Sequence, residues 1–207
     1  MAIFTLPAGL TVNRQTWGQR RFDLTFQGGD NGSSQSRILA PPRWMTSLFV
    51  QQEIDVVQSA LWRSMILDLQ GKIHQLAVYD LINTAPQGTL RGVITLSAAA
   101  AAGATTLSIT AGAGQAATTL KRGDWLGIGT GATSQLVSVS ADAVMNGAGA
   151  ATVSIAQPIR VTQASGTGVV WDKPTALFRL VNDMSTWESK ALTQGGYSLD
   201  LIESWAT

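Results

Sequence analysis

The sequence contains no cysteine and a single histidine among its 207 residues. Without cysteine there can be no disulfide framework, no thiolate metal site and no cysteine nucleophile. One histidine also argues against a transition-metal centre, because such centres take several imidazole or thiolate ligands. We therefore expect a fold stabilised by packing alone, with no metal and no cofactor.

Charge and long apolar runs are scarce as well. Charged residues make up 13% of the chain and the net charge is +1 at pH 7, so the basic surface of a nucleic-acid-binding protein is missing. The longest apolar run, Ala98–Ala102, is far too short to span a membrane, and the N-terminal segment lacks the pattern of a secretion signal. We expect that the protein does not insert into a membrane and that it is made in a reducing cytoplasm.

Residues 120–131, LKRGDWLGIGTG, contain two familiar patterns. Arg-Gly-Asp at 122–124 is the tripeptide that adhesion receptors bind, and Gly-Ile-Gly at 127–129 resembles a phosphate-binding loop. Such a loop needs a helix directly after it, whose N-terminus binds the phosphate, whereas the alternating TSQLVSVSA that follows predicts a strand. Gly-Asp favours a turn that leads into a strand. We interpret this stretch as a turn.

No catalytic pattern stands out. His74 lies in a strand pattern, and nothing in the sequence nominates a nucleophile or an orienting partner for it. Asp80, Asp172 and Asp183 occur singly at the edges of predicted loops, where solvated or capping roles are expected. The sequence therefore predicts a protein that is not an enzyme.

The composition divides the chain into three zones. Residues 85–172 contain seven charged residues in 88 positions, against twenty in the other 119. Short β-type runs separated by Gly-rich turns recur there, as in a small antiparallel barrel or sandwich: GVITL, TTLSIT, DWLGIG, SQLVSVS, ATVSI and GTGVVW. We expect this zone to be a β-domain inserted into an outer domain formed by residues 1–84 and 173–207.

The outer zones predict strands and one helix. Arg20–Gln27 alternates Phe22, Leu24 and Phe26 with polar residues, which predicts a half-buried strand. An extended loop is expected over Gly28–Trp44. A helix is predicted over Gln51–Gln70, with an apolar stripe formed by Ile54, Val57, Leu61, Met65 and Leu69 and widened by Trp62 and Ile66. The predicted fold class is mainly β: a β-sandwich with one flanking helix, plus the inserted barrel or sandwich.

Several aromatic and basic residues are candidates for contacts with other molecules. Trp44 follows two prolines, and Trp205 is the third residue from the end of the sequence. Because large aromatics and arginines contribute most at interfaces, we predict a subunit interface at Arg37, Arg43, Trp44 and Trp205. Trp125 and Trp171 are candidates for a ligand or partner surface on the inserted domain.

The order of these segments resembles the distal tail proteins, or baseplate ring proteins, of long-tailed bacteriophages. The resemblance covers most of the chain and is carried by RRFDLTF, EIDVVQSALWRSMILDLQGKIHQLAVYDL, KPTALFRLVNDMSTW and GGYSLDLIE. Its most specific parts are KRGDWLGIG and ATVSIAQPIR. Proteins of that family have a belt domain that assembles as a hexameric ring, and commonly a second β-domain that projects from it. The insertion of the β-domain within the belt, where the family commonly appends it, is a departure from this pattern.

The resemblance implies a structural virion protein that is made in the host cytoplasm and located at the tail tip. Its expected partners are further copies of itself, the tail tube protein, the baseplate hub, and receptor-binding or fibre proteins, while DNA only passes through the ring. Two alternatives stay open. One is a tail tube or terminator protein, and the other is a carbohydrate-binding module that uses Trp125 or Trp171 on a host surface sugar.

Overall fold

The computed structural model describes residues 1–29, 32–50, 55–184, 186–187 and 196–205. Over these residues the protein is mainly β with one α-helix, α1 (Val56–Asp68), which confirms the predicted fold class. The first sheet has the order β1-β4-β13-β14-β3-β2, with bounds Ile3–Thr5, Gln75–Tyr79, Thr175–Leu180, Tyr197–Glu203, Ser34–Val50 and Arg14–Gln27. The second has the order β11-β6-β5-β12-β8-β9, with bounds Ala150–Ser154, Thr106–Thr110, Ile94–Leu96, Gly168–Val170, Trp125–Ile128 and Gln135–Ser138.

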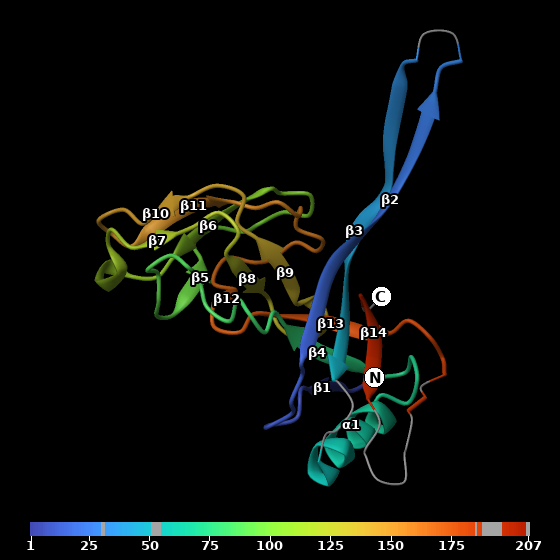
Figure 1. The fold of residues 1–207 in the computed structure, drawn as a ribbon. Coiled ribbons are helices and arrows are strands. Elements are labelled where there is room, and N and C mark those ends of the chain that lie inside the picture. The colour runs from blue at the N-terminus through green and yellow to red at the C-terminus, as the bar shows by residue number, and fades with distance from the viewer. Residues whose placement is uncertain (30–31, 51–54, 185, 188–195, 206–207) are drawn as a thin grey trace.

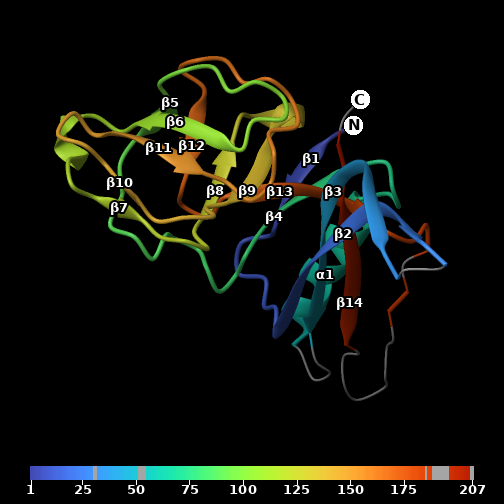
Figure 2. The ribbon, with the colours of Figure 1, turned by 90° about the horizontal axis from the view of Figure 1, so that it is seen from above.

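The two sheets form two lobes that lie side by side (Figures 1 and 2). We call β1–β4, α1, β13 and β14 the split lobe, because its strands come from residues 3–79 and 175–203. We call the strands between residues 94 and 170 the inserted lobe, which also includes the short pair β7 (Thr119–Leu120) and β10 (Ala143–Val144). The chain thus leaves the split lobe after β4 and returns to it at β13.

The inserted lobe follows the strand pattern of its sequence closely. Each of the six alternating runs corresponds to one of its six longer strands. Only the two-residue strands β7 and β10 have no such run, because two residues cannot show an alternation. Apolar side chains from every strand of the large sheet fill its core, among them Ile94, Leu107, Leu126, Val137, Val153 and Val169.

In the split lobe, α1 packs against alternate residues of the curled sheet. Asp55 accepts a hydrogen bond from the Gln58 backbone N–H (2.7 Å) and so caps the helix at its N-terminus. The core combines Trp62, Met65, Ile66 and Leu69 with inward-facing strand residues such as Leu48, Val50, Phe178, Tyr197 and Leu199.

The predicted helix differs from the observed one in part of its face and in its extent. Trp62, Met65, Ile66 and Leu69 of the predicted stripe are buried, but Val57 is 66% exposed, whereas Ser59 is fully buried. The Ser59 hydroxyl lies 2.7 Å from the hydroxyl of buried Tyr197, and this polar contact explains why a serine lies on the buried face. The helix ends at Asp68, and residues 51–54, including Ile54, lie outside the described residues.

The hairpin formed by β2 and β3 extends well beyond the lobes (Figure 1). Strand β14 pairs with β3 only at Met45–Val50, so the rest of β3 pairs with β2 alone among the described residues. We call Arg20–Gln27 and Ser34–Ala40 the arm, and Pro41–Trp44 its root. The prediction of a loop over Gly28–Trp44 is wrong for most of that range, because β3 begins at Ser34.

Candidate functional site

The arm carries an apolar stripe that contacts little else in the chain. Phe22, Leu24 and Phe26 lie on one face of the ribbon because successive strand residues point to opposite faces. Leu24 is 43% exposed and Phe26 is 59% exposed, and only Phe22 is partly covered. The predicted half-burial of this strand is therefore wrong for Leu24 and Phe26 in the single chain.

Charged residues lie on both faces of the arm. Arg20 places its guanidinium 5.3 Å from the ring centre of Phe22, whereas Arg21 and Asp23 form an exposed ion pair on the opposite face (3.0 Å). Arg37, one of the predicted interface residues, is exposed and stands opposite Leu24 in the ladder. The stripe is thus bordered by arginines, a combination that is common at protein interfaces.

A cleft of about 520 Å³ lies between the arm and the inserted lobe. The arm side includes Ile38 and Leu39, which are 65% and 61% exposed, and prolines of the root. The other wall comes from the inserted lobe and includes Thr105, Ala156 and Pro158. The arm therefore has exposed apolar side chains besides those of the stripe.

The root of the arm is attached to both lobes through a buried carboxylate. Glu203, at the end of β14, is 4% exposed and accepts a hydrogen bond from the Trp44 backbone N–H (3.0 Å). Its other oxygen lies 3.4 Å from the Arg160 guanidinium, which also donates to the Ser134 carbonyl (3.1 Å). Burial raises the pKa of Glu203, and the bond from Trp44 and the charge of Arg160 oppose that shift.

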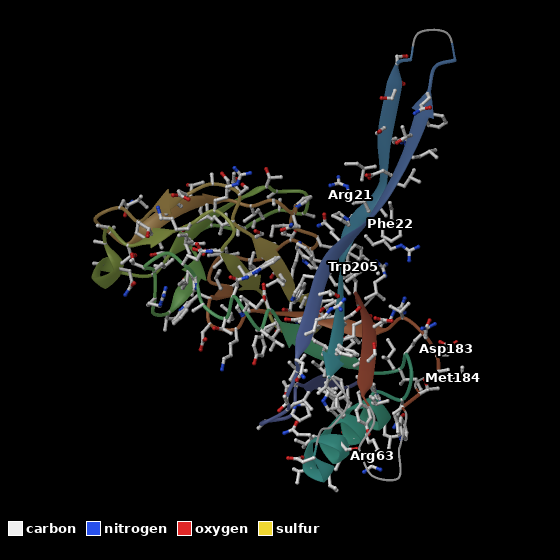
Figure 3. All side chains as sticks on the ribbon, in the orientation of Figure 1. Arg21, Phe22, Arg63, Asp183, Met184 and Trp205 are labelled. Atoms are coloured by element: carbon white, nitrogen blue, oxygen red, sulfur yellow. The ribbon has the colours of Figure 1, made fainter. Side chains whose placement is uncertain are left out.

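Trp205 completes this arrangement. The guanidinium of Arg43 lies 4.4 Å from its ring centre, and that of Arg160 lies 4.8 Å away. Figure 3 shows Trp205 at the point where the hairpin leaves the split lobe, just below Arg21 and Phe22. Three of the four predicted interface residues, Arg43, Trp44 and Trp205, are therefore brought together here, while Arg37 lies apart on the arm.

Trp44 and Trp125 belong to an aromatic cluster between the lobes. Their ring centres are 5.0 Å apart, and Trp17 lies 6.2 Å from the first and 5.9 Å from the second. The Trp44 indole donates to the Leu136 carbonyl (3.1 Å), and the Trp125 indole donates to Asp80 (3.2 Å). Both side chains thus join the two lobes of a single chain.

Asp80 is held ionised in this cluster. Burial acts to raise its pKa, but hydrogen bonds from the Asn83 side chain, the backbone N–H groups of Ile82 and Asn83, and the Trp125 indole together lower it. Such a carboxylate is a structural acceptor that organises the connection after β4.

Trp171, the second candidate ligand residue, directly follows β12, the strand that pairs with the β8 strand of Trp125. Its indole donates to the Gly92 carbonyl (2.7 Å), and the Arg91 guanidinium lies 5.1 Å from its ring centre. Two neighbouring rings pack on Trp125, so Trp171 is the better of the two candidates for a sugar platform.

The other candidate residues have local structural contacts. His74 accepts a hydrogen bond from the Ala2 backbone N–H (3.1 Å), and Asp183 pairs with Lys72 (2.5 Å) on the exposed surface. Asp124 of the Arg-Gly-Asp tripeptide is 3% exposed and accepts from three backbone N–H groups, those of Gln87, Gly88 and Lys121. Within the described residues no three metal-binding side chains cluster.

Sequence reasoning missed Glu203 and Arg160. A signal for Glu203 exists: it continues the alternation of Tyr197, Leu199 and Leu201, which places a carboxylate on the inward face of the strand. Arg160 carries no such signal, because its partners are distant in the sequence.

Comparison with known proteins finds no family model that matches the chain and no curated protein similar to it. In the described part of the chain, no helix is long and apolar enough to cross a membrane. The site must therefore be interpreted from its own geometry.

Proposed function

We propose that this protein is a structural virion protein that forms a ring at the distal end of a bacteriophage tail. In this proposal the ring is a homohexamer that joins the tail tube to the baseplate hub and to receptor-binding or fibre proteins. The position in the virion rests on the resemblance in segment order. The capacity to assemble rests on the exposed stripe of the arm.

The stripe is the observation that carries the proposal. Its alternation is that of a strand with one buried face, yet Leu24 and Phe26 remain exposed in the single chain. An isolated two-stranded ribbon is marginally stable in water, and exposed apolar patches commonly mark interaction sites. A second copy of the chain that covers the stripe supplies the burial that the pattern requires.

Magnitudes favour an assembly in which each subunit takes part in two stripe contacts. Full burial of a Leu or Phe side chain stabilises by about 1.5 to 3 kcal/mol, so the three residues of one stripe supply about 4.5 to 9 kcal/mol, while association costs about 4 to 15 kcal/mol. One stripe alone therefore gives marginal association. In a ring with head-to-tail contacts every copy gives one arm and receives another, so each subunit is held by two stripes.

The test is the native mass of the purified chain by light scattering, followed by negative-stain imaging. We expect a hexamer with a central hole for the unmodified protein. Phe26→Ser removes apolar area from the stripe and is expected to weaken association about tenfold or more. Thr25→Ala, on the opposite face of the same strand, is the matched control and should assemble normally.

Three other results contradict parts of the proposal. A strict monomer at high concentration for the unmodified chain removes the self-assembling ring. Long stacked tubes, in place of single rings, favour the tail tube alternative. Glycan binding that is lost in Trp171→Ala but kept in Phe26→Ser favours the carbohydrate-binding alternative.

A further inference from the structure

The direction of the arm depends on the root, and the hydrogen bonds between β2 and β3 are not sufficient to fix the backbone at this joint. At the root, Pro41 and Pro42 stand opposite Arg21 without ladder partners, and the register shifts on both sides of Phe22. Proline has no N–H to donate, and bulges bend and locally disrupt a strand pair. The hairpin is thus weakest where it leaves the split lobe, which is where a ribbon would bend.

The contacts that surround this weak point come from the inserted lobe and the end of β14. Pro41 and Pro42 line a small space together with Gln157, Pro158 and Arg160 of the inserted lobe. Immediately after the prolines, Arg43 packs over Trp205 and the Trp44 N–H donates to Glu203. The hairpin is therefore tied to both lobes at the bend.

Arg160 is the charged residue through which the inserted lobe contacts this joint, in addition to the hydrogen bond from the Trp44 indole to the Leu136 carbonyl. It contacts Glu203 and the ring of Trp205, and it is anchored in its own lobe by bonds to Ser134 and, through its backbone N–H, to the Gln135 side chain (2.8 Å). Both Arg160 and Glu203 are largely buried, so the attraction between them is little screened by solvent. A movement of the inserted lobe is transmitted to the root by this contact.

We propose that the inserted lobe sets the angle of the arm through Arg160, Glu203 and Trp205. This inference concerns the single chain and goes beyond the assembly proposed above, since it holds whether or not copies of the chain form rings.

The absence of cysteine allows a direct test, because introduced cysteines are the only labelling sites. Spin labels at Gln27→Cys on the arm and Ala148→Cys on the inserted lobe report the distance between the two by pulsed dipolar spectroscopy. The measurement is made in a Phe26→Ser background, so that no neighbouring copy holds the arm. We expect a single narrow distance distribution for the intact joint.

Arg160→Met removes the ion pair with Glu203 and the cation contact with Trp205, and we expect it to broaden or shift that distribution. Lys121→Met is the matched control: it breaks the exposed pair of Lys121 with Asp142 in the same lobe, away from the joint, and leaves the distribution unchanged. Trp205→Leu is the second variant, and it is used if the circular dichroism spectrum shows that Arg160→Met does not fold. A narrow, unshifted distribution in the folded joint variant overturns the inference.

Discussion

The two halves of the β2–β3 hairpin share the same strands and the same alternation but have opposite environments. In the inner half, Leu48 and Val50 are fully buried beneath α1 and beside β14. In the arm, beyond the last pair with β14, Leu24 and Phe26 are largely exposed. The same alternation thus accompanies a buried face in the inner half and an exposed face in the arm. Alternation alone therefore does not determine whether a face is buried by its own chain.

The largest expected effect is on the inner half. Leu48→Ala leaves a cavity in the core of the split lobe, so we expect it to lower the free energy of unfolding by about 2 to 5 kcal/mol. Denaturant unfolding followed by tryptophan fluorescence measures this change. A loss of less than about 1 kcal/mol would mean that the inner half is as poorly packed as the arm, and the contrast would disappear.

An intermediate effect is expected where the two halves meet, and it depends on pH. Burial raises the pKa of Glu203 above its ordinary value of 4.5. A carboxyl group with a raised pKa binds its proton more tightly in the folded protein. Its contribution to stability is therefore fully present below the ordinary pKa and is lost as the pH rises through the raised one.

Glu203→Gln removes this titration. Between about pH 4 and pH 7 the free energy of unfolding of the variant should fall less than that of the unmodified protein. Urea unfolding at both pH values, with Asp200→Asn on the exposed face of the same strand as control, tests the prediction. Equal pH dependence in the variant and the unmodified protein would show that the root carboxylate is not the responsible group.

The smallest effect on stability is expected in the arm. Leu24→Ala is the same chemical change as Leu48→Ala on the same hairpin, yet it should alter the free energy of unfolding of the monomer by no more than about 0.5 kcal/mol. Its effect should appear in the native mass instead, as weaker association. If Leu24→Ala destabilises the monomer as strongly as Leu48→Ala does, the arm is buried within its own chain.

The strands of the inserted lobe could be predicted because each one is short, alternating and bounded by glycine-rich turns. The helix and most of its buried face could be predicted, but the burial of Ser59 could not, since it depends on Tyr197, 138 residues away. The arm shows the same limit: its pattern indicated a buried face, but Leu24 and Phe26 are exposed in the single chain, because β14 stops pairing with β3 before the arm begins. Contacts between distant residues are not visible in local periodicity.

The strand order of the split lobe also determines when that lobe can fold during synthesis. Strands β13 and β14 lie in the middle of its sheet, between β4 and β3, although they leave the ribosome after all its other strands. Translation of the intervening inserted lobe takes roughly 5 to 20 s at typical rates. Throughout that time β1 to β4 have no central strands to pair with, and at the end of it the inserted lobe has all of its own strands. The nascent chain therefore completes its second sheet before its first.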